Sequence, residues 1–425
     1  MPFSYPYSRI AQAMRPSPIR ELFALTQRPG LISFAGGLPD PAIFPVERFA
    51  ECAEVLRQNG RTALQYGATE GYPPLVEWVC QRMAAFLGRS VTPAQVVIAS
   101  GSQQLLDMLA RVLLDPGDVV LVESPTYPGA LHTLRNAGAR FLLVPSDGEG
   151  ILVEALPELV ERCRRGTGRA PKLLYTVINF SNPSGATLSR QRRERLAALL
   201  PALEVPVLED DPYGELRFAG EALPSLYSLA GGEGVVYASS FSKILAPGAR
   251  VAWAVGEPEL IRRLVVAKQG MDLCTSTVAQ VLVAEYCRQG HLEAHLGAIR
   301  RHYAVKAEAM EAALQAHVAA HATWSRPLGG FFYWLSLAGR DCQDLFHRAL
   351  AAGVAFLPGR AFYPDAAETL GPPGDGRECL RLCFTFAQPE EIQEGCRRLA
   401  TALSAPELEP LPEHPLLVEE RGRPQ

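Results

Sequence analysis

Short apolar runs and longer amphipathic stretches alternate through the middle of the chain. Between about residues 95 and 255, each apolar run is followed by a turn and then by residues with helical spacing. This alternation predicts a mostly parallel sheet with helices on both of its faces. The predicted strands are residues 96–99, 119–122, 141–144, 173–178, 205–208, 235–238 and 249–255. We therefore predict an α/β fold whose large domain holds a mostly parallel, seven-stranded sheet.

The flanking regions follow other patterns. Residues 17–28 and 47–59 have helical spacing, and Ser17 is a candidate N-cap for the first of these helices. Residues 259–319 are also helical, and strand and helix patterns then mix up to about residue 404, with strands expected over 354–357 and 380–386. This mixture predicts a smaller α+β domain. We divide the chain into an N-terminal arm with one helix (1–45), a large domain (46–290), a small domain (291–404) and a flexible tail rich in proline and glutamate (405–425).

Composition and charge narrow the classes of function. Of 425 residues, 48% are hydrophobic and 20% are charged, which is typical of a globular enzyme with a large core. The net charge of −4 does not favour binding to nucleic acid or to an anionic membrane. We expect no signal peptide, and no apolar run reaches the roughly 18 residues that a membrane span needs. The nine cysteines have no metal-ligand spacing, so we expect free thiols in a reducing cytoplasm and no metal site.

Polar side chains follow several of the predicted strands. Because ligands bind beyond the carboxyl ends of the strands in open α/β sheets, residues at these positions are candidates for one common site. We expect seven residues to meet there although they are far apart in the sequence. They are Ser102, Gln103, Tyr127, Asn182, Asp210, Tyr213 and Lys243.

The stretch around Lys243 carries the strongest chemical signal. A lysine at a strand end, among small and apolar residues, is a candidate for an amine that desolvation keeps partly neutral. Such an amine can form an imine with an aldehyde. The nearby hydroxyls of Ser240 and Ser242 and the guanidinium of Arg250 suit a phosphate dianion. An aldehyde and a phosphate together describe pyridoxal 5'-phosphate (PLP), whereas the alternative is a surface lysine after a strand.

Two glycine-containing turns add weaker signals. The predicted strand 96–99 leads through Ser100 and Gly101 into a helix, an arrangement that points backbone N–H groups and a helix dipole at a phosphate. Gly36 and Gly37 allow the backbone to approach a ligand closely, although a plain turn explains them equally well.

These motifs together resemble the fold-type I PLP-dependent aminotransferases. The resemblance extends over most of the chain and keeps the order of the motifs, and it is nearest to the group with bacterial 2-aminoadipate aminotransferases and mammalian kynurenine/aminoadipate aminotransferases. The matching stretches are residues 19–22, 26–30, 33–39, 65–67, 100–104, 182–185, 209–213, 240–243, 250 and 380–381. The set is specific for the family and much less specific for the substrate.

The resemblance implies a role for each cofactor-binding residue. Lys243 would be the lysine that forms a Schiff base with PLP, and Asp210 would meet the pyridine nitrogen. Tyr213 and Asn182 would bind the ring hydroxyl, and Tyr127 would stack on the ring. The phosphate would be held by Ser102, Gln103, Ser240, Ser242 and Arg250, and also by Tyr66 from a partner subunit. The last of these implies a homodimer with shared active sites.

The resemblance also implies how the substrate is bound. Arg381 would hold the α-carboxylate as a bidentate fork, together with Asn182, while Gly36 and Gly37 would line the substrate. Arg20 lies on the N-terminal helix, which would cap the substrate and read the distal carboxylate of acidic amino acids. Pro18 stands where threonine is commoner in the family, which leaves the breadth of specificity open.

We therefore expect a PLP-dependent transaminase of amino acid metabolism, including lysine biosynthesis. It would move the α-amino group of 2-aminoadipate, glutamate or an aromatic or branched-chain amino acid to a 2-oxo acid, with 2-oxoglutarate as the expected acceptor. Lys243 would transfer the Cα proton. A biosynthetic aromatic or aryl-glycine aminotransferase, a PLP-dependent lyase or decarboxylase, and a transcription regulator with an aminotransferase-like domain are the alternatives. We expect the last of these less, because only a short segment precedes Ser17.

Overall fold

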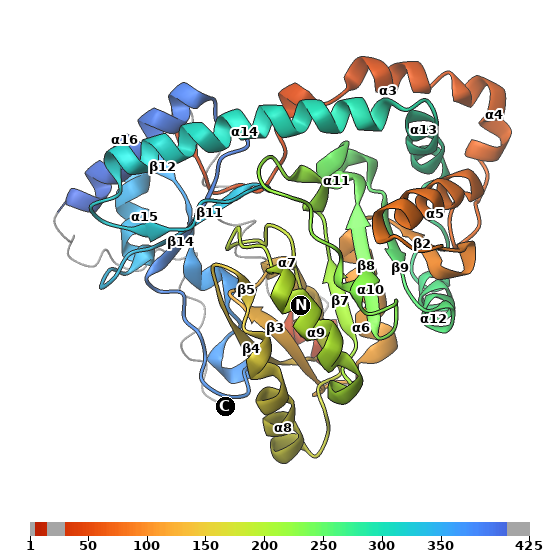
Figure 1. Cartoon of the computed structure of the whole chain (residues 1–425), viewed down its shortest axis with the longest axis horizontal. Coiled ribbons are helices and arrows are strands. Elements are labelled where there is room, and N and C mark those ends of the chain that lie inside the picture. Colours follow the sequence, from red (N-terminus) through yellow and green to blue (C-terminus); the bar gives the residue numbers. More distant parts are fainter. Residues whose placement is uncertain (1–4, 15–29, 406–425) are drawn as a thin grey trace.

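The central element of the computed structural model, which describes residues 5–14 and 30–405, is an eight-stranded sheet (Figure 1). Its strand order is β2-β9-β8-β7-β6-β3-β4-β5, and neighbours from β8 to β4 run parallel. β9 is antiparallel to both of its neighbours, and β5 is a two-residue antiparallel strand at one edge. The strands are β2 (Val96–Ala99), β3 (Val119–Ser124), β4 (Arg140–Asp147), β5 (Gly150–Ile151), β6 (Leu173–Thr176), β7 (Val207–Asp210), β8 (Val235–Ser240) and β9 (Ala252–Val255). The predicted mostly parallel sheet is confirmed, with seven strands plus the short edge strand β5.

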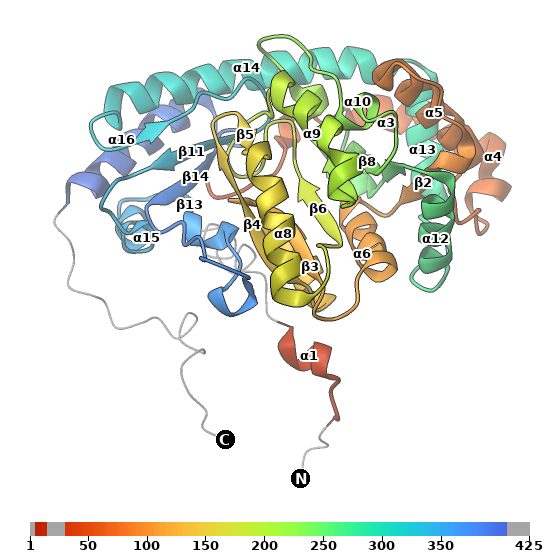
Figure 2. The same cartoon turned by 60° about the horizontal axis from the view of Figure 1, so that its bottom comes forward.

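Helices cover both faces of this sheet. α8 (Leu156–Thr167), α9 (Arg190–Leu203) and α10 (Leu226–Leu229) contact one another on one side, which faces the viewer in Figure 2. α6 (Ser102–Leu113), α7 (Pro128–Asn136) and α12 (Pro258–Gln269) contact one another on the other side. Every residue of β2, β6, β7, β8 and β9 is buried. Burial on both faces explains why these strands have continuous apolar sequences instead of alternating ones.

A second, smaller sheet lies beside the first. It is antiparallel with the order β10-β11-β14-β13, formed by β10 (Thr323–Trp324), β11 (Phe332–Ser336), β13 (Leu357–Pro358) and β14 (Cys379–Cys383). α15 (Cys342–Ala351) and α16 (Pro389–Ser404) pack with it. The long helix α14 (His291–His317) extends across the top of the molecule in Figure 1, from α16 to α13 (Thr277–Arg288).

Two predicted elements differ from the structure. The helix expected over 47–59 is two helices, α3 (Val46–Cys52) and α4 (Val55–Ala63), because the chain between them makes tighter bonds such as that from the Glu54 amide to the Glu51 carbonyl. The strand expected over 354–357 is split because its halves join different sheets. β12 (Val354–Ala355) pairs with β1 (Ile32–Ser33), whereas β13 pairs with β14. The predicted domain boundaries stay a prediction.

The remaining described helices complete the picture. α5 (Pro73–Leu87) packs on β2 and α13, and α11 (Phe241–Ile244) is one turn directly after β8. α1 (Arg9–Ala13) lies apart from the rest of the fold in Figure 2. Within residues 5–14 and 30–405, no helix is both long and apolar enough to cross a bilayer.

Replacing Arg193 by leucine should destabilise the large sheet and its covering helix. Arg193 of α9 is fully buried and donates to the Leu188, Pro224 and Ile178 carbonyls and to Asn179 Oδ1. Arg193→Leu leaves these buried acceptors short of a donor, so we expect a loss of about 3 kcal/mol in the free energy of unfolding. Urea titration of both variants measures this loss. Arg195→Leu, on the exposed side of the same helix, is the control and should change the free energy of unfolding by less than about 0.5 kcal/mol. Equal losses in both variants would contradict this account.

Candidate active site

Residues from the ends of several strands and from the small sheet meet at one place. Asp210 ends β7, Ser240 ends β8 and Lys243 lies in α11 immediately after β8. Hydrogen bonds join this edge to the small sheet and to the N-terminal segment, as shown by Lys243 with Gly37 and Arg381 with Asn182. The prediction that distant loops converge is therefore met by the geometry, and it extends to the small sheet through β14.

The Lys243 side chain is half-buried and has no carboxylate partner among the described residues. Its Nζ donates to the Gly37 carbonyl at 3.0 Å and lies 5.7 Å from the ring centre of Phe331. Burial lowers the pKa of Lys243 to about 8, and the nearby cations Arg381 and Arg250 act in the same direction. The sequence contains only three other lysines, of which Lys268 and Lys306 are buried in ion pairs with aspartates and Lys172 is exposed. Lys243 is thus the lysine suited to act as a nucleophile near neutral pH.

Asp210 presents a carboxylate oxygen that lacks a partner. The Tyr175 hydroxyl donates to Oδ2 at 2.8 Å, but Oδ1 is buried and accepts no hydrogen bond within the described part of the chain. Burial raises the pKa of Asp210 to about 7, which the hydrogen bond from Tyr175 only partly offsets. A proton-bearing ring nitrogen against Oδ1 would satisfy this atom. The donor set therefore fits the pyridine ring of PLP.

Arg250 and the start of α6 form a basic, donor-rich corner. The Arg250 guanidinium donates to the Ser100 carbonyl at 3.2 Å and to Ser242 Oγ at 3.5 Å. It lies directly against Gly101 (φ +93°), where a β-carbon would collide with it. The first amides of α6, beginning at Ser102, have no acceptor within the helix and carry the positive end of its dipole. This corner fits a phosphate, because backbone donors and a guanidinium converge there.

Ser240 and Gln103 were also predicted to hold the phosphate, and their side chains have different hydrogen-bond partners. Ser240 is buried, and its Oγ accepts from the Ser242 amide at 3.1 Å, which orients the turn that carries Lys243. The side-chain amide of Gln103 points to α7 instead, where it donates to the Gly129 carbonyl at 3.0 Å and to the Thr133 hydroxyl. Gln103 can therefore offer a ligand its backbone amide, while its side chain fixes α6 against α7.

Arg381 is a buried cation without an anion. It lies on β14 at 2% exposure, and no ion pair of Arg381 exists among the described residues. Nη1 donates to Asn182 Oδ1 at 2.7 Å, and Nη2 donates to the carbonyls of Ala35 (2.7 Å) and Gly36. Its Nε is buried and has no partner. Burial lowers the pKa of Arg381 to about 10. A bound carboxylate would compensate this charge.

Aromatic rings enclose these polar groups. The Arg381 guanidinium lies 4.4 Å from the ring centre of Phe332 and 5.1 Å from that of Phe362. Tyr213 is buried and makes edge contacts with Phe331 and Phe332, and burial raises its pKa. Tyr127 precedes α7, and burial raises its pKa as well, with the charges of Asp210, Arg381 and Arg250 all acting on its hydroxyl. Both tyrosines therefore belong to the same site as the ions.

One predicted residue is not brought to this site within the described chain, and another falls on residues that the structure does not describe. The Tyr66 side chain is 78% exposed, and its backbone amide is bound by the Gln65 side chain. Arg20 lies outside the described residues.

Three residues of the site were not predicted. Phe332 and Phe362 stack on Arg381, and their apolar runs carry no sign of this contact. Glu123 of β3 is buried and accepts from the Thr176 and Ser181 hydroxyls (2.5 and 2.8 Å) and from a backbone amide. It thereby holds the loop that carries Asn182. A glutamate inside the apolar run 119–123 was the available signal, since acids are rarely buried without a partner.

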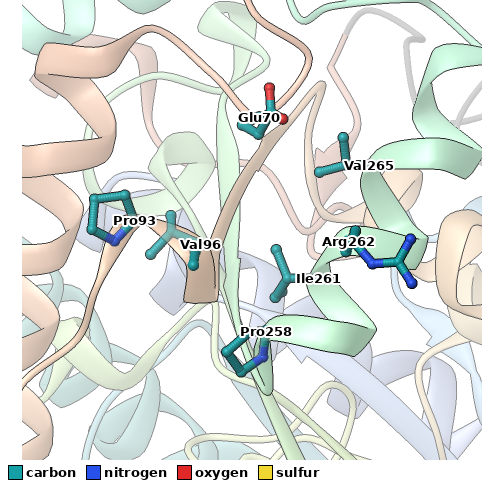
Figure 3. Close-up of a pocket in the computed structure, with 8 residues that line it drawn as sticks. Glu70, Pro93, Val96, Pro258, Ile261, Arg262 and Val265 are labelled. Atoms are coloured by element: carbon teal, nitrogen blue, oxygen red, sulfur yellow. The ribbon is translucent and has the colours of Figure 1, made fainter.

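A separate cavity of about 290 Å³ lies at the far edge of the large sheet. It is lined mainly by apolar side chains next to β2 and α12, as Figure 3 shows for Val96, Pro258, Ile261 and Val265. None of the predicted site residues lines it, and its lining contains no lysine, cysteine or serine. We therefore assign the chemistry to the site around Lys243.

Lys243 should react with cyanate faster than its exposure suggests. A lysine in water has a pKa of about 10.4, so very little of its amine is neutral at pH 8. The pKa of Lys243 is lowered to about 8, so about half of this amine is neutral at that pH. With limiting cyanate and apoenzyme freed of PLP, peptide mass spectrometry should find Lys243 carbamylated before the exposed Lys172, and the preference should disappear above pH 10. Faster modification of Lys172 at pH 8 would show that the Lys243 amine is not activated.

Comparison with known proteins agrees with this chemistry. Residues 36–399 match the family described as aminotransferase class I and II. The chain is 44% identical to a 2-aminoadipate transaminase from Thermus thermophilus, over 94% of this chain and 97% of that protein. It is 38% identical to an aromatic-amino-acid aminotransferase from Thermococcus litoralis, over 93% of this chain and 94% of the relative.

Solved structures agree with the sequence matches. The alpha-aminoadipate aminotransferase from Thermus thermophilus, complexed with N-(5'-phosphopyridoxyl)-L-leucine, superimposes with a TM-score of 0.82 and 42% identity, covering 93% of this chain and 97% of that one. A multiple substrate aminotransferase from Thermococcus profundus gives a TM-score of 0.87 at 38% identity, again over 93% and 97%. This chain therefore belongs to the class I and II aminotransferases, as a fold-type I enzyme that uses PLP.

Proposed function

We propose that this aminotransferase acts on amino acids with an acidic side chain, 2-aminoadipate and glutamate, and uses 2-oxoglutarate as the acceptor. The observation that carries the transamination part of this proposal is the buried, uncompensated Arg381 within the same network as the partly neutral Lys243. An α-carboxylate bound at Arg381 brings the adjoining Cα–H close to an amine that can accept a proton. The likeness to a 2-aminoadipate transaminase supports the acidic substrate, and it also supports a role in lysine biosynthesis.

Each residue of the site has a distinct task in this proposal. Asp210, with Tyr175 behind it, would hold the ring nitrogen, while Arg250, Ser102, Ser240, Ser242 and the amide of Gln103 would hold the phosphate. Tyr213, Asn182 and Tyr127 would position the ring. When bound, PLP supplies an aldehyde that accepts amino groups and a ring that withdraws electrons from the substrate.

Lys243 would work as both base and acid. Its neutral amine would take the Cα proton, and the resulting ammonium would later pass that proton to the carbon that was the aldehyde carbon of PLP. A pKa of about 8 serves both tasks, because the two protonation states have similar free energies near neutral pH. Gly37 supports this exchange by keeping the amine at a hydrogen-bond distance of 3.0 Å from a backbone oxygen.

We also propose a homodimer in which Tyr66 of one subunit reaches the phosphate of the other. Tyr66 is 78% exposed and the nearby Leu64 is 81% exposed, which a covering subunit would explain. We place the enzyme in the reducing cytoplasm, because all nine cysteines are free and seven of them are buried.

Aromatic amino acids form the alternative substrate class, which the likeness to an aromatic-amino-acid aminotransferase favours. A survey of donors separates the two classes. Stopped-flow absorbance of the PLP enzyme, mixed with one amino acid and no oxo acid, should show the cofactor colour bleaching fastest with 2-aminoadipate and glutamate. We expect these to exceed leucine, tyrosine and kynurenine by at least about tenfold in kcat/KM.

Two results would contradict these assignments, one from the donor survey and one from a variant. Faster bleaching by tyrosine or kynurenine would replace the acidic substrate with an aromatic one. Turnover by Lys243→Ala near the wild-type rate would overturn the assigned base.

Neighbouring aspartates provide a matched test of the proposed ring contact. Asp210→Asn should lower kcat on the order of 10²-fold, because the amide does not stabilise a positive ring nitrogen as a carboxylate does. Asp211 is equally buried, but its carboxylate accepts from Asn179 and Tyr237, away from the unpaired oxygen. Asp211→Asn should therefore lower the melting temperature with a much smaller change in kcat. If Asp211→Asn lowered kcat as much as Asp210→Asn at equal folded concentration, the assignment of Asp210 would be wrong.

A further inference from the structure

The segment 34–40, here called the strap, contacts both cations of the active site. It is extended and lies between β1 and the short 3-10 helix Pro41–Ile43. Four consecutive carbonyls of the strap each accept a hydrogen bond from a side chain. Ala35 and Gly36 accept from Arg381, Gly37 accepts from Lys243 at 3.0 Å, and Leu38 accepts from Thr385 Oγ1 at 2.5 Å. The position of the strap therefore sets the position of Arg381.

The glycines of the strap cannot hold this position by themselves. Gly36 and Gly37 have no side chains to pack, and glycine loses the most conformational freedom on ordering. At its first end the strap is fixed by two backbone bonds, from the Phe34 amide to the Ala355 carbonyl and from the Cys383 amide to the Phe34 carbonyl, both 2.8 Å. Its other end depends on Asp40.

Asp40 is fixed to α14 by a buried ion pair. Lys306 Nζ lies 2.6 Å from Asp40 Oδ2, and the side chains are only 2% and 5% exposed. His302, one turn earlier on α14, contacts the same oxygen at 2.8 Å, and the Tyr303 hydroxyl accepts from the Asp40 amide at 3.0 Å. Burial acts to raise the pKa of Asp40, but the bonds from Lys306, Ala42 and His302 outweigh it and lower that pKa. Asp40 is therefore anchored as an anion.

Lys306 also contacts the chain that leaves the Arg381 strand. Its Nζ donates to the Thr385 carbonyl at 2.8 Å and to the Phe386 carbonyl at 3.4 Å. These residues follow β14, on which Arg381 lies, and Thr385 is the residue that holds Leu38. One ammonium thus joins the end of the strap, the continuation of β14 and the long helix α14.

We infer that the Asp40–Lys306 pair positions Arg381 for the substrate carboxylate by fixing the strap against α14 and β14. This inference rests on the proposed role of Arg381. Neither Asp40 nor Lys306 touches the substrate, so both are positioning residues. In the wild-type enzyme the strap carbonyls hold the Arg381 guanidinium in place before the substrate binds. If the strap is loose, these carbonyls move, and the guanidinium moves with them away from the position that binds the carboxylate.

The test compares Asp40→Asn, Lys306→Met and the double variant with wild type. It measures KM and kcat for the fastest amino donor and for 2-oxoglutarate, the melting temperature, and the affinity of the apoenzyme for PLP. Both substrates carry an α-carboxylate. We therefore expect KM for both to rise by at least about tenfold in all three variants, with kcat changed by less than about threefold. The affinity for PLP should stay within about twofold of wild type, since Arg250 and α6 are not touched.

The double variant separates positioning from stability. Each single variant leaves one buried charge unpaired, whereas the double variant removes both charges, so its melting temperature should recover toward wild type. The KM defect should persist, because the double variant lacks the Asp40–Lys306 ion pair and the Lys306 bonds to Thr385 and Phe386. Only the bond from the backbone amide of residue 40 to Tyr303 and the side-chain contact with His302 remain. A double variant that regains both stability and wild-type KM would overturn the inference, as would folded single variants with unchanged KM.

Lys268→Met is the matched control. Lys268 is also fully buried and also paired with an aspartate, Asp272 at 2.8 Å, but Asp272 is bonded to Ser100 beside the phosphate corner. The melting temperature of this variant should fall by about as much as that of Lys306→Met, and its binding of PLP should weaken. Its KM should change by less than about threefold. A KM rise equal to that of Lys306→Met would also overturn the inference. If the wild-type enzyme shows no bleaching with any donor, the proposed function fails first, independently of these ratios.

Discussion

An unpaired buried charge governs this active site. Arg381 lies at 2% exposure with no anion near it in the described chain, and Asp210 keeps one carboxylate oxygen without a donor. Such groups destabilise a fold unless a ligand completes them. A carboxylate at Arg381 and a protonated ring nitrogen at Asp210 would compensate both, so cofactor and substrate binding should each stabilise the folded enzyme. The lowered pKa of Lys243 has the same origin, since burial and the two nearby arginines disfavour a further positive charge.

The parallel sheet explains why these groups meet. The loops after β2, β3, β6, β7 and β8 start from neighbouring or nearby strands, so their first residues share one edge. α6 adds its N-terminal amides at this edge, and Gly101 leaves the space into which Arg250 fits. The amides of α6 and the Arg250 guanidinium therefore concentrate positive potential at this edge of the sheet, where a phosphate would bind.

The position of the residues proposed to bind the substrate depends on contacts between the two sheets. Arg381 belongs to the small sheet, Lys243 to the large one, and the strap contacts both through adjacent carbonyls. α14 passes along both sheets and holds the end of the strap through Lys306. Carboxylate recognition and proton transfer thus share contacts with one backbone segment: Arg381 donates to the Ala35 and Gly36 carbonyls, and Lys243 donates to that of Gly37.

The sequence alone determined the fold class, and it predicted Lys243, Asp210 and Arg250 as residues of the site. Local rules carry this information, because apolar runs, turns and the residues that follow strand ends are all short-range features. Tertiary structure decided the rest. It turned the amide of Gln103 away toward α7, placed Phe332 and Phe362 against Arg381, buried Glu123 beneath the Asn182 loop and joined Asp40 to Lys306 across 266 residues. Such contacts depend on packing between distant segments, and no local pattern in one chain specifies which buried charges will become partners.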